Sequence, residues 1–105
     1  MASPKIMFDK TEIVAKAIVV NETNKKKAKL LRLNADSFSK ISFVPCKVRK
    51  LFKRVDSEKI VLNLRGYARP VEYSKKDNSA FYDSYKEGFA KFAKDNNIVL
   101  EDRTN

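Results

Sequence analysis

Four aromatic residues near the C-terminus recur at helical spacing: Phe81, Tyr85, Phe89 and Phe92. This spacing places their rings on one flank of a helix, and so large an apolar flank must be buried against another element. We therefore expect a helix over about 79–95 that packs on a sheet. Asp77, Asn78 or Ser79 can cap its first turn.

Two residues of this predicted helix are not part of the aromatic flank. Tyr82 lies just beside the flank; we expect it in the core with the four flank residues, although of the five rings it is the one most open to exposure. Gly88 weakens the helix slightly, and we expect it to permit close packing against a neighbouring element.

The residues before this helix have patterns typical of strands. Residues 60–67 (IVLNLRGY) alternate between two faces, with Ile60, Leu62 and Leu64 on the apolar one. Residues 12–20 are rich in β-branched side chains, which favour a strand. Weaker strand signals lie at 28–33, where a helix over 25–33 competes, and at 40–44, 71–73 and 98–100.

The segment 45–54 (PCKVRKLFKR) fits two kinds of structure. Apolar residues fall at i, i+3, i+4 and i+7, which predicts one face of a short basic helix: Val48, Leu51, Phe52 and Val55. Pro45 suits the first turn of such a helix, because its missing N–H costs nothing there. Val44, Cys46 and Val48 also alternate, which leaves an extended start open, but we favour the helix.

Together these patterns predict an α+β fold in a single domain, 1–105, with short flexible ends at about 1–5 and 101–105. We expect a small antiparallel sheet of about four to five strands, with the basic helix near 45–54 and the aromatic helix near 79–95 packed on it. No stretch approaches the roughly 18 apolar residues of a membrane span. The first five residues have no apolar core like that of a signal peptide, so we expect an intracellular, cytoplasmic protein.

The residue types that are missing argue against most enzymes. The absence of histidine excludes imidazole catalysis and histidine-ligated metals. A lone cysteine, Cys46, provides neither an internal disulfide nor a thiolate metal cage. With two glycines the chain has no Gly-rich phosphate loop. We therefore expect no enzymatic activity, no cofactor and no metal.

Two groups of residues have the side chains for catalysis but fit it poorly. Carboxylates and lysines have only generic spacing for a metal-dependent nuclease: Asp56, Glu58, Lys59, Glu72 and Lys75. Cys46 lies among cations that favour a thiolate, but no base stands near it in the sequence. A small buried residue is the better interpretation of Cys46.

The positive charge of the chain is concentrated in its first half. Residues 1–54 contain 14 Lys and Arg against 4 acidic residues, whereas residues 55–105 contain 9 of each, so the whole net charge of +10 lies before Val55. Evenly scattered charge would serve solubility, whereas one-sided charge attracts a polyanion. We expect these cations to form one continuous patch.

Two groups of residues predict binding to nucleic acid. Cations of the first half would neutralise phosphates: Lys25, Lys26, Lys27, Lys29, Arg32, Lys40, Lys47, Arg49, Lys50, Lys53 and Arg54. On the strand 60–67, an exposed aromatic ring between arginines would stack on an unpaired base: Arg65, Tyr67 and the nearby Arg69. Burial of Tyr67 against a second core face is an equally good interpretation.

The leading hypothesis is thus a non-enzymatic protein that binds DNA or RNA mainly through the phosphate backbone, without a membrane partner, and a homodimer is left open. The alternative is a small inhibitor or adaptor, in the style of viral or mobile-element proteins, that docks on an acidic surface of a larger protein or nucleoprotein.

Overall fold

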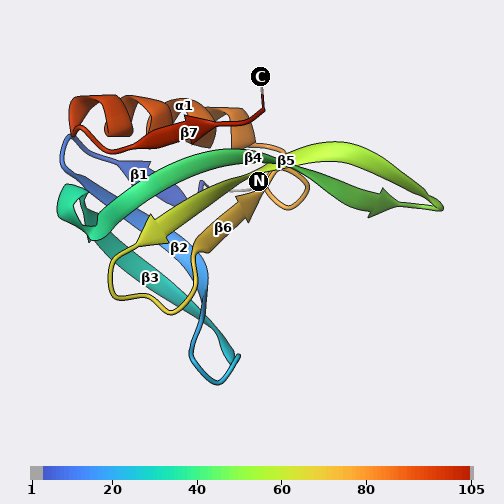
Figure 1. The fold of residues 1–105 in the computed structure, drawn as a ribbon, viewed down its shortest axis with the longest axis horizontal. Helices are drawn as coiled ribbons and strands as arrows, with labels where there is room; N and C mark the ends of the chain where they lie inside the picture. The colour runs from blue at the N-terminus through green and yellow to red at the C-terminus, as the bar shows by residue number, and fades with distance from the viewer. Residues whose placement is uncertain (1–3, 105) are drawn as a thin grey trace.

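A computed structural model describes residues 4–104, apart from the side chain of Lys50. The α+β class is confirmed, but across these residues the strands form two sheets, of three and four strands, instead of one (Figure 1). The elements follow in the order β1 Ile6–Phe8, β2 Glu12–Val20, β3 Lys26–Asn34, a 3-10 turn Ala35–Ser37, β4 Phe38–Lys50, β5 Lys53–Leu64, β6 Val71–Ser74, α1 Tyr82–Asp95 and β7 Leu100–Asp102.

The first sheet has the antiparallel order β1-β2-β3. The strand predicted over 12–20 is confirmed as β2, which buries every second residue, Ile13, Ala15 and Ala17. The whole of β3 pairs with β2, so the competing helix over 25–33 is wrong. Paired backbone groups and burial of Leu31 and Leu33 decide against helix propensity here.

The turn between β2 and β3 has ordinary turn chemistry. The Asn21 side-chain oxygen accepts hydrogen bonds from the Thr23 N–H at 3.0 Å, the Thr23 hydroxyl at 2.8 Å and the Lys25 N–H at 3.0 Å. Asn24 takes the left-handed backbone conformation, φ 62°, which asparagine tolerates better than most residues. This hairpin end is therefore well suited to its turn.

The second sheet has the order β6-β5-β4-β7, and β7 runs parallel to β4. Its main feature is a long antiparallel hairpin in which β4 pairs with β5 out to Lys50 and Lys53. The basic helix predicted near 45–54 is therefore wrong, because these residues form the outer half of the hairpin. The alternation of Val44, Cys46 and Val48 is the signal that describes them correctly.

Pro45 does not interrupt this strand, for a reason of register. The Ile41 N–H donates to the Val99 carbonyl at 2.9 Å, and the Phe43 carbonyl accepts from the Arg103 N–H at 2.8 Å. Odd-numbered residues of β4 therefore direct their backbone groups away from β5. Pro45 continues this series beyond the end of β7, so its missing N–H costs no hydrogen bond to β5.

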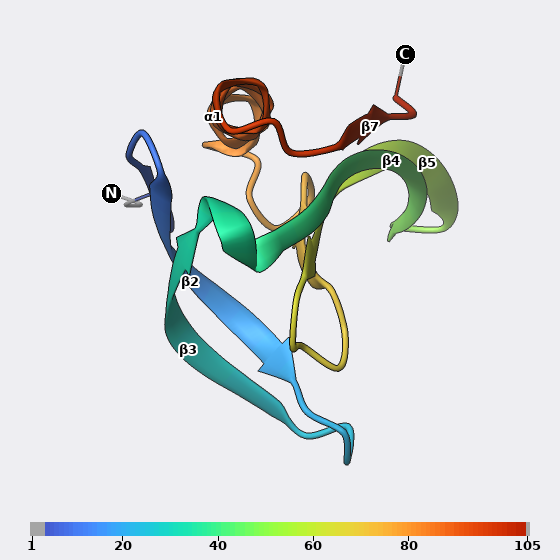
Figure 2. The same cartoon turned by 60° about the vertical axis from the view of Figure 1, so that its left-hand side comes forward.

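The core lies where α1 covers both sheets; Figure 2 shows the helix end-on above them. Three residues of the predicted aromatic flank, Tyr85, Phe89 and Phe92, are buried, Phe81 just before α1 is half-buried, and rings of the flank contact rings from both sheets. Phe89 meets Phe8 of β1 with centroids 4.9 Å apart, and Phe92 meets Phe38 of β4 at 5.5 Å. A hydrogen bond of 3.1 Å from the Tyr73 hydroxyl to the Lys16 carbonyl also joins β6 to β2.

Tyr82, expected in the core but with the greatest chance of exposure among the five rings, is buried, at 1% exposed. The helix starts at Tyr82, so this residue faces the core as the chain enters the helix from the preceding turn. Burial, and then the nearby Glu58 carboxylate, raise the pKa of the Tyr82 hydroxyl above its usual range. Burial likewise raises the pKa of Tyr73.

The C-terminal end is ordered further than the sequence predicts. Glu101 and Asp102, expected within a flexible end, belong to β7 and pair with Ser42 and Phe43. The Thr104 hydroxyl and N–H donate to the Asp102 carboxylate at 2.6 and 2.9 Å and hold the pKa of that carboxyl below its usual range. At the other end, residues 1–3 of the predicted flexible segment lie outside the described residues, as does residue 105.

Gly88 provides a first test of this packing. A Cβ at this position would lie 2.5 to 2.8 Å from three ring carbons of Phe8, so glycine allows that ring to reach Phe89. Gly-to-Ala changes in a helix ordinarily stabilise by about 0.5–1 kcal/mol. Here overpacking reverses the sign, and we expect Gly88→Ala to lose about 1 kcal/mol in urea unfolding.

The matched control places the same change in a Phe8→Ala background, where the clash is absent. There Gly88→Ala should stabilise by the ordinary helix amount. Equal effects in the two backgrounds would contradict the proposed contact.

The buried tyrosines predict a loss of stability in alkali. Since the pKa of Tyr73 and Tyr82 is raised in the folded state, their contribution is complete below the unfolded value of about 10 and falls as pH rises above it. Each group contributes a slope of up to about 1.4 kcal/mol per pH unit. Urea unfolding between pH 8 and 11.5 measures this slope. Tyr82→Phe should make it shallower, and an unchanged slope would argue against the effect.

Candidate nucleic-acid interface

The outer half of the β4–β5 hairpin extends beyond the core. Phe43 and Ile60, which face each other across the hairpin, are its outermost buried side chains among the described residues. Seven further residue pairs follow before the turn, from Val44 and Lys59 out to Lys50 and Lys53. At about 3.4 Å per residue these pairs reach roughly 24 Å. Figure 1 shows this arm projecting away from the other elements.

The base of the arm is anchored to α1. The Lys86 ammonium donates to the Glu58 carboxylate at 2.9 Å and to the Thr104 hydroxyl at 2.8 Å. It also lies 5.4 Å from the centre of the Phe43 ring. The Lys86 and Glu58 side chains are only 25% and 20% exposed, so this ion pair is screened less than a surface pair. The arm therefore leaves the body from a fixed base.

The end of the arm brings like charges together. In the pairing register Arg49 stands opposite Arg54, and Lys50 stands opposite Lys53. Like charges directly opposite each other on adjacent strands are destabilising. Among the described residues, no carboxylate lies within 4.0 Å of Arg49, Lys53 or Arg54. Within the described residues, the positive charge of these three side chains is therefore not balanced by a carboxylate.

The tip of the arm is a two-residue turn of Leu51 and Phe52, whose side chains are 89% and 99% exposed. Leu51 has a backbone φ of 56°, a conformation that favours glycine or asparagine. Two-residue hairpin turns normally use Asn-Gly, Asp-Gly or a leading glycine for this reason. We call the segment 47–56 with this turn the basic arm.

At the inner end of the basic arm, Lys47 forms an ion pair with Asp56. Of the predicted binding residues, the basic arm thus contains Lys47, Arg49, Lys50, Lys53 and Arg54. The Lys50 side chain lies outside the described part of the structure.

A second group of predicted binding residues lies on the β2–β3 hairpin. Lys25, Lys26, Lys27 and Lys29 are exposed near its end, whereas Arg32 lies 3.7 Å from the Glu12 carboxylate. Figures 1 and 2 show the ends of the two hairpins well apart. The expectation of one continuous basic patch is therefore wrong, because the excess cations are divided between two separate hairpins.

The remaining predicted residues do not form the expected stacking surface. The strand ends at Leu64, so Arg65 and Tyr67 follow it in a loop and do not share a strand face. Tyr67 is half-buried against the core. Arg69 donates to the Asn24 side chain at 2.6 Å, and Lys40 pairs with Glu101 at 3.4 Å. These side chains serve contacts within the fold.

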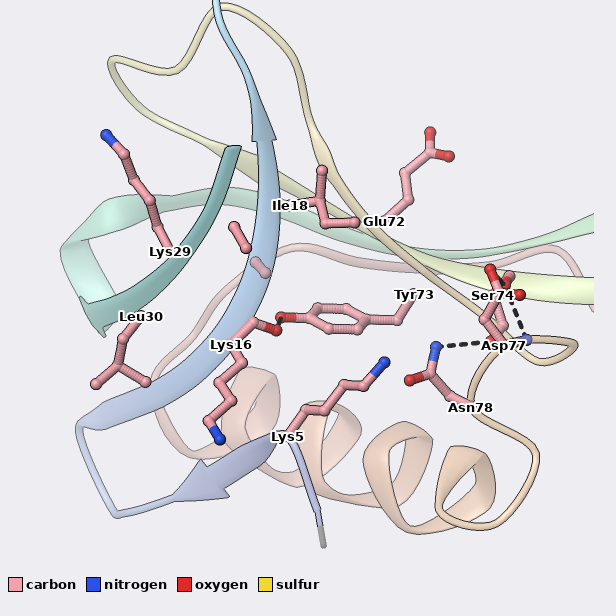
Figure 3. Close-up of a pocket in the computed structure, with 12 residues that line it drawn as sticks. Lys5, Lys16, Ile18, Lys29, Leu30, Glu72, Tyr73, Ser74, Asp77 and Asn78 are labelled. Atoms are coloured by element: carbon pink, nitrogen blue, oxygen red, sulfur yellow. Dashed lines mark hydrogen bonds between the residues drawn. The ribbon is translucent and has the colours of Figure 1, made fainter. Parts of the chain in front are cut away.

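A hollow of about 630 Å³ lies between the β2–β3 hairpin and β6. Figure 3 shows Lys5 and Lys16 below the Tyr73 ring, with Ser74, Asp77 and Asn78 at one side. The Tyr73 hydroxyl donates a hydrogen bond to the Lys16 carbonyl, and the Asp77 carboxylate accepts one from the Ser74 hydroxyl at 2.9 Å. The Tyr73 hydroxyl and the Ser74 and Asp77 side chains are thus hydrogen-bonded within the protein.

The carboxylates of the candidate nuclease site form ion pairs with lysines: Asp56 with Lys47, Glu58 with Lys86, and Glu72 with Lys59 at 3.0 Å. In the described part of the chain no group of three His, Cys, Asp or Glu side chains is arranged to hold a metal ion. The Cys46 thiol is half-buried on β4, opposite Ser57.

Comparisons with protein-family models, with curated proteins and with solved structures find no match to this chain. Between residues 4 and 104, α1 is neither long nor apolar enough to cross a membrane, and no other helix is.

Sequence reasoning missed the role of Leu51 and Phe52, which it assigned to the buried face of a helix. The signal was present in the symmetry of the segment VRKLFKRV, residues 48–55. Read from its centre outwards, each residue has a partner of the same type at the same distance. A two-residue turn at the centre places these partners opposite each other, as the register shows.

The opposed arginines give a prediction that is independent of any ligand. Arg54→Glu replaces a like-charged pair with an ion pair across the hairpin, and we expect it to stabilise the protein by about 0.2–1 kcal/mol. Urea unfolding at low and high salt measures the gain, which should shrink as salt screens the charges. The neutral variant Arg54→Gln is the control and should gain less. A loss of stability on Arg54→Glu would contradict the opposed register.

Proposed function

We propose that this protein is a non-enzymatic nucleic-acid-binding protein, and that the basic arm is its main contact with the phosphate backbone. The observation that carries the proposal is that two pairs of like-charged residues stand opposite each other at the arm's end: Arg49 opposite Arg54, and Lys50 opposite Lys53. Because opposed like charges repel each other, this arrangement lowers the stability of the free protein. An anion that lies along the arm would offset the repulsion.

The shape of the arm supports the same proposal. A two-stranded antiparallel ribbon is one of the elements that proteins place in a groove of duplex nucleic acid. The roughly 24 Å beyond the core is long enough for phosphate contacts on both sides of a groove. Lysines and arginines that bind phosphates release condensed counterions, so the affinity is expected to depend strongly on salt.

The β2–β3 hairpin is proposed as a secondary contact. Its exposed lysines at 25–27 and 29 add to the field that attracts a polyanion. Their positions across the hairpin are apolar, since Lys27 stands opposite Val19 and Lys29 opposite Ala17. These lysines therefore do not face like charges across the hairpin, as the arginines of the basic arm do.

A second candidate function is docking on an acidic surface of a larger protein or nucleoprotein. One observation favours it: Met7, Ile18 and Leu30 are 68%, 62% and 64% exposed on the outer face of the three-stranded sheet. Alternate residues of β2 share a face, so Val14, Lys16 and Ile18 point to the same side of the sheet. Met7 pairs with Val14 and Leu30 pairs with Lys16, which places both of them on this same face. An apolar face bordered by lysines suits a protein partner or a second copy of the chain.

The test is fluorescence anisotropy of labelled duplex and single-stranded DNA and RNA across a salt series. Replacing Arg49, Lys53 and Arg54 with glutamine should weaken binding strongly. It should also reduce the magnitude of the log–log salt slope on duplex DNA by about 2.7, if each cation neutralises one phosphate.

The matched control removes the same charge elsewhere, with Lys76, Lys91 and Lys94 replaced by glutamine on exposed positions outside the arm. This variant should bind nearly as well as the original protein. Equal losses for the two triple variants would refute the arm as the interface. Absence of binding to every nucleic acid at low salt would refute the function and leave the protein-docking candidate.

A further inference from the structure

We propose that the tip of the basic arm is a wedge: Phe52, supported by Leu51, inserts between neighbouring base pairs of duplex DNA and bends it. This inference rests on the proposed function and adds a mechanism to it. It assigns a role to two side chains that the phosphate contacts leave unused.

The first argument is exposure. Phe52 is 99% exposed and Leu51 is 89% exposed, so the core gains almost nothing from either side chain. Both stand at the end of the longest hairpin among the described residues, with only charged neighbours, Lys50 and Lys53, on either side in the sequence. Large apolar groups held in this way against water indicate a surface that binds something.

The second argument is the backbone of the turn. Leu51 has φ 56°, where a glycine or asparagine would be under less strain. The Asn21–Lys25 turn of the other hairpin uses asparagine at its left-handed position, Asn24. The tip of the basic arm therefore presents large apolar side chains at a site where folding favours small or polar ones.

The third argument is charge, and it identifies the occupant. Arg49 and Arg54 stand on one face of the arm, and the alternation of side chains places Lys53 on the other. Cations on both faces just behind an apolar tip match a duplex groove, which has a row of phosphates on each side and stacked bases between them. Architectural proteins that bend DNA insert apolar side chains between base steps in this way.

A single strand fits this geometry less well. Stacking on an unpaired base requires a ring that lies on a platform beside one phosphate chain. Phe52 projects from the end of a narrow ribbon, and the described cations flank it on both faces. We therefore assign duplex DNA as the partner of the tip.

The experiment measures bending by energy transfer between dyes at the two ends of a 30-base-pair duplex. The original protein should bring the ends closer, and Phe52→Ala should abolish this change. The affinity of Phe52→Ala for the duplex should stay within about tenfold, because the cost of unstacking a base step disappears together with the contact. Its thermal unfolding should be unchanged, since the side chain is exposed.

A duplex with one mismatched step gives a second readout. The bases at the mismatch are already partly unstacked, so inserting the Phe52 ring costs less free energy there. The original protein should therefore prefer the mismatched duplex over the matched one by roughly tenfold. Phe52→Ala should lose this preference. Leu51→Gly should raise the unfolding temperature by removing the left-handed strain, and should bend the duplex less.

A direct probe is available because the chain contains no tryptophan. Phe52→Trp introduces a single indole, whose emission should be largely quenched by stacking when duplex DNA is added. Val99→Trp, at another exposed apolar position, is the matched control and should respond little.

The outcomes separate the two proposals. If the original protein binds no nucleic acid, the proposed function fails. Binding to duplex without bending, or equal bending by Phe52→Ala, overturns the wedge but leaves backbone binding in place. Quenching of the Phe52→Trp emission by single strands alone would also overturn it, since the tip would then stack on unpaired bases.

Discussion

The aromatic flank of α1 is the contact on which the rest of the structure depends. A single sheet cannot enclose a core without a second layer packed on it, and no strand among the described residues belongs to both sheets. Phe89 and Phe92 pack on Phe8 of one sheet and Phe38 of the other, so the helix fills the space that the sheets share. Burial of these rings sets how the two sheets meet, and with it the directions in which the hairpins leave the core.

Both hairpins are thus fixed near the helix, but their far ends differ: the Arg69 side chain contacts Asn24 at the β2–β3 end, whereas the outer half of β4–β5 extends beyond the core. For the β4–β5 hairpin the fixed point is the partly buried Lys86–Glu58 ion pair, which joins the helix to the strand where the core ends. Beyond it, the outer pairs are held by backbone hydrogen bonds with little burial. A ribbon of this kind can follow the shape of a ligand while its base stays in place.

Much of the fold could be predicted from local patterns, and the errors arise where partners decide. Alternation identified β2 and the inner part of β5, and helical spacing identified α1. The segment 45–54 was misread because its apolar spacing also fits a helix; the alternation of Val44, Cys46 and Val48 and the symmetry of residues 48–55 favour the hairpin, and pairing with β5 decides between the two. The shared strand face predicted for Arg65 and Tyr67 was wrong because the strand ends at Leu64. Of the two interpretations of Tyr67, packing against the core is the one found, and the same loop takes Arg69 to Asn24. The cations were identified as residues, but their division between two hairpins depends on the topology.

The two hairpins of this molecule allow the function of one to be argued from the other. They share the same core, yet the β2–β3 end has asparagines suited to its turn and lysines opposite apolar residues, an arrangement that folding and solubility explain. The β4–β5 end has a leucine in left-handed conformation, an exposed phenylalanine and two like-charged pairs. The left-handed leucine and the opposed like charges cost stability, the exposed phenylalanine contributes none, and all of these features lie within six consecutive residues, 49–54. The proposed function accounts for this difference between the two ends, because like charges that repel each other in the free protein would both attract a bound anion.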